Sequence, residues 1–196
     1  MSGKTRVLLD RPTRRAAILR AAGAAFAERG FAATSMDDVA AAAAISRLIV
    51  YRHFDTKEAL YAAVLQLVRD RLAEEGRAAG GRGESSAVRA LLAVAREDPA
   101  GVTLLLTHAA REPHFAWYAD EFREEVIAYA DRLMRAARAP ARVRGRWAAE
   151  TLVSFVFDAL LHWIEDGDSA RDGEFLARVD ASLPALVAAW AGVTRR

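Results

Sequence analysis

Cysteine is absent from the 196 residues. The chain therefore forms neither a disulfide framework nor a zinc site built on thiolates. Charge-free stretches such as residues 181–194 fall short of the ~20 residues that cross a bilayer, and that one contains Pro184 and Gly192. The first residues hold no apolar run longer than residues 7–9 to serve as a signal peptide. We therefore expect a cytoplasmic protein without a membrane span.

A strong overall charge is lacking too, but the charge is unevenly placed. The formal net charge is +2, yet residues 1–20 carry six basic side chains and one acidic one. Residues 1–60 carry a net charge of +4, which leaves −2 for the remainder. A basic N-terminal segment suits the neutralisation of phosphates, although a solvated tail and a solvated helix face would look the same.

What the chain does have is helical periodicity almost throughout, and strand signals are absent. A first helix is expected over residues 14–29, with Thr13 as its cap and Gly30 just after its end. The inward side chains of this helix would be Ile18, Leu19, Ala22, Ala25 and Phe26.

Residues 34–60 are the most informative segment, because their capping and turn residues predict three short helices in succession. Ser35 can cap the first, with Asp38 in the place of a capping-box acid. After a run of small residues, Ile45 supplies an apolar side chain that can pack inward, and Ser46 can cap the next helix.

The second of these helices covers residues 47–51, and Asp55 then caps the third, with Glu58 completing another capping box. Two short helices separated by a tight turn predict a helix-turn-helix. A helix of one and a half turns fits a DNA major groove.

The same segment matches a known pattern at fixed spacing. The matching residues are Phe31, Thr34, Ser35, Val39, Ala40, Ala43, Ile45, Ser46, Tyr51, His53, Phe54, Lys57, Glu58 and Leu60. This pattern resembles the tetracycline-repressor (TetR) family of bacterial transcription regulators over roughly residues 13–61. The chain departs from the family at Ala44, where glycine is usual, so the turn must be built without the residue that most easily takes a positive φ.

The resemblance implies an all-α protein in which an N-terminal three-helix helix-turn-helix DNA-binding head is joined by a long helix to a helical ligand-binding and dimerisation body. We expect the head over residues 1–60 and the body over residues 61–196. The implied partners are double-stranded operator DNA, a small-molecule effector and a second copy of the chain, with no cofactor. The implied function is transcription regulation, as a repressor released from its operator by a small apolar or amphipathic effector.

Base readout is expected from the second helix of the motif. Arg47 is its one residue able to make a bidentate hydrogen bond to guanine, whereas Leu48 and Ile49 offer only methyl contacts or shape. The family often has small or polar residues at the last two positions, which alters the operator sequence expected but not the binding mode.

Phosphate contacts are expected around that helix. Tyr51, His53 and Lys57 match family positions that contact the DNA backbone, and Ser35 and Arg52 can add to them. Packing at an aromatic helix end is the alternative for Tyr51 and His53.

Beyond the head, a long helix over residues 56–75 would connect head and body. The glycine-rich loop of residues 78–86 lacks the Gly-Lys-Ser/Thr ending of a phosphate loop, so no nucleotide site is expected there. Five further helices, separated at proline or glycine, are expected near residues 86–97, 100–111, 114–138, 141–166 and 173–192.

The last two of these helices are apolar around more than one face. The resemblance assigns them to a four-helix bundle between two copies, while an internal core is the alternative. The candidate interface residues are Trp163, Leu186 and Trp190. Pro184 should bend the last helix or start its ordered part.

Ser154, Asp158 and His162 recur at four-residue spacing and form a polar stripe on one helix face. The stripe faces solvent or the dimer partner, or it supplies polar contacts to an otherwise apolar effector. Two aromatic side chains and a histidine could line the cavity that holds this effector, or they could belong to the core instead. These are His108, Trp117 and Phe122.

Catalysis is the main competing class of function. The polar stripe contains the residue types of a hydrolase triad, but four-residue spacing provides neither an oxyanion hole nor a nucleophile elbow, so we do not expect an enzyme. The four histidines lack metal-ligand spacing, so no metal site is expected. A helical small-molecule carrier without DNA activity is a further alternative, which Arg47, Tyr51 and Lys57 argue against.

Overall fold

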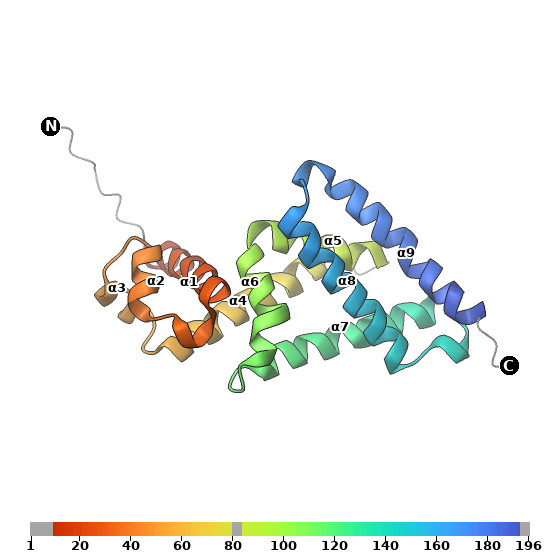
Figure 1. The fold of residues 1–196 in the computed structure, drawn as a ribbon, viewed down its shortest axis with the longest axis horizontal. Helices are drawn as coiled ribbons and strands as arrows, with labels where there is room; N and C mark the ends of the chain where they lie inside the picture. The colour runs from red at the N-terminus through yellow and green to blue at the C-terminus, as the bar shows by residue number, and fades with distance from the viewer. Residues whose placement is uncertain (1–9, 80–83, 193–196) are drawn as a thin grey trace.

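The computed structural model describes residues 10–79 and 84–192. Within these ranges every regular element is helical, which confirms the predicted all-α class. Figure 1 shows a small N-terminal head beside a larger helical body. The head contains α1 (Arg11–Ala33), α2 (Met36–Ala42) and α3 (Arg47–Tyr51), and α4 (Lys57–Ala78) runs from it into the body. Residues 80–83 of the predicted glycine-rich loop lie outside the described residues.

The first helix begins earlier than predicted. Asp10 rather than Thr13 is its cap, because the Asp10 carboxylate accepts a hydrogen bond from the Thr13 backbone N–H at 2.9 Å. Pro12 lies in the first turn, where its missing N–H has no helical partner to lose. Gly30 has φ 80° and ψ 165°, so α1 is interrupted at the predicted end and resumes only briefly, to Ala33.

The turn between α2 and α3 is built without glycine. Ser35 caps α2 with a complete capping box, as predicted. At its other end Ala44 has φ 52°, and the Ile45 N–H returns to the Ala40 carbonyl at 3.0 Å. A left-handed alanine costs about 1–2 kcal/mol, and the packing of Ile45 against the core offsets that cost. Ser46 occupies the cap position of α3 but makes no side-chain capping hydrogen bond.

The cap of α4 differs from the prediction. The Thr56 hydroxyl accepts a hydrogen bond from the Ala59 N–H at 3.0 Å, so the cap is Thr56 and the predicted capping box of Asp55 and Glu58 is wrong. The physical reason is that the chain is still extended at Thr56, with φ −136° and ψ 162°, and the first helical residue follows it. The helix continues to Ala78, past its predicted end.

The body consists of α5 (Glu84–Glu97), α6 (Pro99–Thr103), α7 (Ala116–Ala136), α8 (Arg146–Asp166) and α9 (Asp172–Gly192). Figure 1 shows α9 on the side of the body away from the head, with α8 beside it. The predicted helix over residues 100–111 is broken into α6, a π-helical segment (Leu104–His108) and a 3-10 turn (Ala109–Arg111).

Two further expectations for the body need correction. The helix expected over residues 141–166 starts only at Arg146, because Gly145 takes φ 144° and residues 141–143 form a separate 3-10 turn. Of the two alternatives for Pro184, a start of the ordered helix is wrong, because Pro184 lies inside α9. A bend at this position stays a prediction.

An aromatic cluster joins the head to the body. The Phe31 ring of α1 lies 5.0 Å from the Tyr61 ring of α4 and 5.1 Å from the ring of Phe115, which precedes α7. Tyr61 and Phe115 lie 4.5 Å apart, and Phe26 contacts Tyr61 edge-on at 5.0 Å. These edge and tilted contacts are the favourable arrangements of aromatic rings. The orientation of the head is therefore set by α4 together with this cluster.

Candidate functional site

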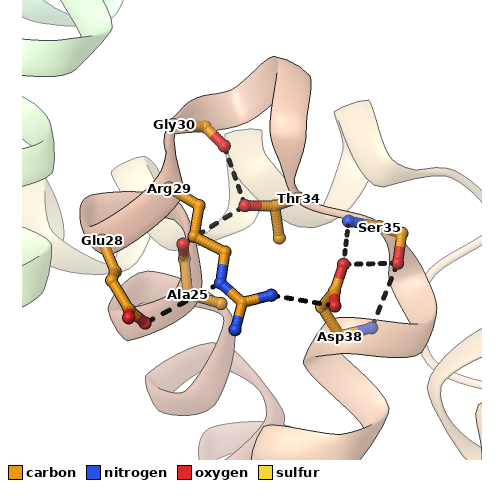
Figure 2. A network of polar contacts seen from close by, with 7 residues as sticks. All are labelled: Ala25, Glu28, Arg29, Gly30, Thr34, Ser35 and Asp38. Atoms are coloured by element: carbon orange, nitrogen blue, oxygen red, sulfur yellow. Dashed lines mark hydrogen bonds and ion pairs between the residues drawn. The ribbon is translucent and has the colours of Figure 1, made fainter.

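The corner between α1 and α2 is held by a polar network, which Figure 2 shows. The Asp38 carboxylate accepts hydrogen bonds from the Ser35 backbone N–H at 2.8 Å and from the Ser35 hydroxyl at 2.6 Å, and it pairs with Arg29 at 3.0 Å. The hydrogen bond from the Ser35 hydroxyl is the main cause that lowers the pKa of Asp38. Thr34 is buried, and its hydroxyl donates a hydrogen bond to the Gly30 carbonyl oxygen at 2.8 Å. The network fixes α2, against which α3 packs.

Arg47 extends from the first turn of α3 into solvent. Its Nη1 lies 2.9 Å from Asp37 Oδ2 on α2, its Nη2 donates to the Tyr51 hydroxyl at 3.3 Å, and its guanidinium lies 5.2 Å from the Tyr51 ring centroid. The Tyr51 hydroxyl and the Asp37 charge raise the pKa of Arg47. Sequence reasoning missed Asp37. The available signal was an acid in the first turn of α2, opposite an arginine in the first turn of α3.

The two apolar candidates of α3 differ in accessibility. The Leu48 side chain is 63% exposed, whereas Ile49 is partly buried and packs against the core. Val50 and Phe54 are buried in the core. Of these two side chains, Leu48 is therefore the one that is more accessible to solvent.

His53 lies close to the basic start of α1. Partial burial, followed by the charges of Arg11, Arg14 and Arg15, lowers its pKa. The guanidinium of Arg15 also lies 5.0 Å over the Phe54 ring. The structure thus gathers the N-terminal arginines and the end of α3 into one cationic surface.

Lys57 has a structural role that the sequence did not reveal. Its ammonium donates to the Phe31 carbonyl at 2.8 Å and to the Ala32 carbonyl at 3.4 Å, and it lies 4.3 Å from the Phe31 ring centroid. Lys57 therefore ties the first turn of α4 to the end of α1. Arg52 and Ser35, the other two residues expected to add phosphate contacts, are both exposed.

A cavity of about 720 Å³ lies inside the body between α4, α5, α7, α8 and α9. Its lining is mostly apolar, and Phe122 of α7 stacks on Phe157 of α8 with ring centroids 5.9 Å apart. The charged side chains in the lining are Arg77, Glu125 and Arg132. This volume falls within the range typical of small-molecule sites, so the cavity can hold an apolar or amphipathic molecule.

Of the six residues predicted to contact an effector, Phe122 lines this cavity and the other five do not. His108 is half-buried in the π-helical segment. Trp117 is 48% exposed and stacks on Tyr118 with ring centroids 3.7 Å apart.

The polar stripe of α8 lies away from the cavity. The cavity is lined from α8 by residues 152–153 and 156–157, and Ser154, Asp158 and His162 fall on the other side of the helix. Asp158 and His162 are exposed, so the carboxylate needs no buried partner. The interpretation of this stripe as a contact set for a ligand in this cavity does not hold, because the apolar side of α8 is the one that faces inward.

Two of these three side chains, those of Ser154 and His162, make hydrogen-bond contacts. The Ser154 hydroxyl accepts a hydrogen bond from Arg123 Nη2 at 2.7 Å, while the His162 Nδ1 atom lies 2.7 Å from the Asp158 carbonyl oxygen on its own helix. Among the described residues, no hydrogen bond joins the side chains of Ser154, Asp158 and His162 to one another.

Helices α8 and α9 are apolar over most of their length and only partly buried. The windows Arg146–Glu165 and Ser169–Gly192 have a mean hydropathy of 1.2, and only 33% and 22% of them are buried. Both helices are long and apolar enough to cross a membrane, but the core helix of a soluble protein can be equally long and apolar. Trp147, which the sequence analysis did not single out, is 64% exposed and packs against Trp190 with ring centroids 5.0 Å apart.

The three predicted interface residues differ in their contacts and in their accessibility. The Trp163 indole N–H donates to Asp172 at 2.7 Å, and its ring stacks on Phe175 at 5.3 Å, so its contacts lie between α8 and α9 of one protomer. Leu186 and Trp190 are partly buried on α9 and remain accessible.

Comparisons with known proteins agree with this geometry. Residues 18–64 match the family model described as bacterial regulatory proteins, tetR family. The chain is 32% identical over 178 residues to the HTH-type transcriptional activator FasR of Mycolicibacterium smegmatis, covering 84% of this chain and 81% of that protein.

Two solved structures share the fold. A TetR-like transcriptional regulator from Rhodococcus sp. RHA1 superposes with a TM-score of 0.78 at 23% identity, covering 94% of this chain and all of that one. AibR, solved in complex with isovaleryl coenzyme A and operator DNA, superposes with a TM-score of 0.67 at 18% identity, covering 86% of this chain and 97% of that one.

Proposed function

The chain belongs to the tetR family of bacterial regulatory proteins, and we propose that it is a dimeric repressor released from operator DNA by a small molecule bound inside its body. One observation carries the proposal: α4 starts beside the recognition helix and lines the cavity with Leu72 and Gly76 near its other end. A ligand that displaces the far part of α4 therefore acts on the same rigid element that orients the head.

On DNA, α3 lies in the major groove. Arg47 reads guanine and Leu48 contacts a thymine methyl, while Tyr51, Arg52 and His53 lie toward phosphates. The cationic start of α1 adds sequence-independent affinity. Because two recognition helices must lie about 34–36 Å apart to enter successive major grooves, a small change in head separation is enough to disfavour binding.

Dimerisation uses the outer faces of α8 and α9. Trp147 and Trp190 form the aromatic centre of this surface, with Leu186 beside them. Two largely uncovered apolar helices on one protomer are what a four-helix interface between two copies requires. Asp158 and His162, exposed on α8, would lie within or beside that interface.

Operator fragments selected from random DNA and measured by fluorescence anisotropy test the DNA-binding part. We expect nanomolar to micromolar affinity for the selected sequence and weaker, salt-sensitive binding to a scrambled duplex. Equal affinity for both duplexes would contradict operator recognition.

The effector part is tested by adding dodecanoate or dodecanol to the same complex. Release of DNA by either molecule supports the proposal. Val156→Trp, which fills the cavity from α8, should raise the concentration needed for release, whereas Arg89→Gln, on α5 outside the lining, should not. Thermal melts establish that both variants are folded. Release that is unaffected by Val156→Trp would place the effector elsewhere.

A further inference from the structure

We propose that the cavity selects a ligand with a long apolar chain and an anionic terminus, which Arg77 of α4 and Arg132 of α7 hold at the cavity mouth. The inference rests on the proposed effector function and names the chemistry of the molecule that fills that site. The anion is a carboxylate or a phosphate, both of which present acidic oxygens to the two guanidinium groups.

The apolar part of the ligand follows from the cavity walls. Apart from the three charged residues, the lining side chains are predominantly aliphatic and aromatic. Liquid packing allots ~30 Å³ to a water-sized atom, so about 720 Å³ holds roughly 24 non-hydrogen atoms. An acyl chain of about 12–16 carbons fits this space with its head group at the opening.

The two arginines lie toward the same end of the cavity. α4 and α7 run side by side in the same direction, since Tyr61 contacts Phe115 near their starts and Arg69 reaches Glu121 and Glu125 further along. Arg77 lies about two turns beyond Arg69 on α4, and Arg132 lies about two turns beyond Glu125 on α7. The two arginines are therefore at a similar height along the paired helices. Both are exposed while also lining the cavity, so the cavity meets solvent where they lie.

Their charge is available to a ligand. Neither Arg77 nor Arg132 pairs with a carboxylate of a described side chain. The guanidinium of Arg132 lies 5.7 Å from the centroid of the Tyr129 ring. Glu125, the acidic residue of the lining, is already paired with Arg69 at 3.1 Å. The mouth is thus cationic, and an anionic head group complements it.

The test measures binding to the full chain, without DNA, by isothermal titration. The probes share one tail and differ in head group: dodecanoate, dodecanol, dodecyltrimethylammonium and lauroyl coenzyme A. We expect at least one of the two anions to bind about tenfold or more tightly than the alcohol and the cation. The double variant Arg77→Gln, Arg132→Gln should remove that advantage, while Arg89→Gln, on α5 outside the lining, should retain it.

The two anionic probes separate the sources of the head group. Arginine-dependent preference for dodecanoate identifies a carboxylate, and the same preference confined to lauroyl coenzyme A identifies a phosphate. Equal affinity for alcohol and anions, or an anion preference that survives the double variant, overturns the inference. Because both arginines are exposed, their replacement should leave the melting temperature unchanged, which the same samples report.

This result is separable from the proposed function. If dodecanol binds as well as the anions and releases operator DNA, the inference fails and the effector function stands. If an anion binds through the arginines but leaves the operator complex intact, the inference stands and the release mechanism fails.

Discussion

The guanidinium of Arg47 and the carboxylate of Asp37 lie 2.9 Å apart and link the two helices of the helix-turn-helix. With the Tyr51 hydroxyl at 3.3 Å, this contact uses two of the five N–H donors of the arginine. Three donors remain, enough for a bidentate contact to guanine. Asp37 therefore orients the side chain expected to read the operator without consuming its capacity to do so.

The first prediction concerns base recognition. Arg47→Ala should weaken operator binding by roughly 1–3 kcal/mol and relax preference at one base pair in each half-site. Asp37→Asn should reduce the ratio of operator to scrambled affinity while strengthening binding to scrambled DNA, because a negative charge near the phosphates is lost. Anisotropy titrations of both duplexes give the ratios. Equal losses on both duplexes for Arg47→Ala would contradict its role in base readout.

Lys57 is expected to act on stability and affinity together. Lys57→Ala removes a hydrogen bond to the Phe31 carbonyl and a cation–π contact, so unfolding should become easier by about 1 kcal/mol. If the lysine also contacts phosphate, operator and scrambled DNA should lose affinity alike. Thermal melts and titrations on one preparation report both effects. A lower melting temperature with unchanged DNA affinity would leave Lys57 a purely structural residue.

His53 should couple DNA binding to pH. Burial and the three arginines of α1 lower its pKa in the free protein, whereas a phosphate beside it would raise the pKa in the complex. Binding then takes up a proton, so operator affinity should rise as pH falls through the pKa of the complex and level off below the pKa of the free protein. His53→Gln should flatten the profile between pH 8 and pH 5, while His162→Gln should not. An identical slope in His53→Gln would exclude the contact.

The head was predictable because its signals are local. Ser35 caps α2, as residue type and short-range spacing predict. The left-handed conformation of Ala44 follows from its position in the turn and not from residue type, because alanine disfavours a positive φ. The caps at Asp10 and Thr56 were missed because the nearby Thr13 and Asp55 are equally good capping types. In such cases the backbone angles at the helix start decide, and residue type does not specify them.

The cavity was not predictable from the same reasoning. Its lining comes from five helices that are distant in sequence, so no local spacing marks it. Ser154, Asp158 and His162 drew attention as polar residues in an apolar helix, but α8 has two partly apolar sides. Which side faces inward depends on the packing of α7 and α9 against it, and that is a tertiary property.

The proposed dimer interface predicts a specific loss of assembly. Trp190→Glu would place a carboxylate beside Trp147 at the centre of an apolar surface, where an unpaired charge is costly, so the variant should be monomeric or aggregate. Arg178→Glu, an exposed charge change on the same helix, should remain dimeric. Sedimentation velocity at micromolar concentration distinguishes these outcomes. A monomeric wild-type chain would contradict the interface.

Tyr61 offers a test of the joint between head and body. The side chain is fully buried, its hydroxyl oxygen has no hydrogen-bond partner in the described structure, and burial, with the charge of Glu112 adding to it, raises its pKa. A buried hydroxyl without a partner carries a desolvation penalty of about 1–3 kcal/mol, whereas a phenylalanine keeps every ring contact with Phe31 and Phe115.

Tyr61→Phe should therefore raise the free energy of unfolding by about 1 kcal/mol, which is a rise of roughly 2–4 °C in melting temperature for a chain of this size. Tyr118→Phe is the matched control, because the Tyr118 hydroxyl is not among the buried atoms without a partner, and its removal should change little. Calorimetry of the three proteins decides the matter. A loss of stability in Tyr61→Phe would mean that the hydroxyl is hydrogen-bonded in solution, with a buried water as the simplest partner.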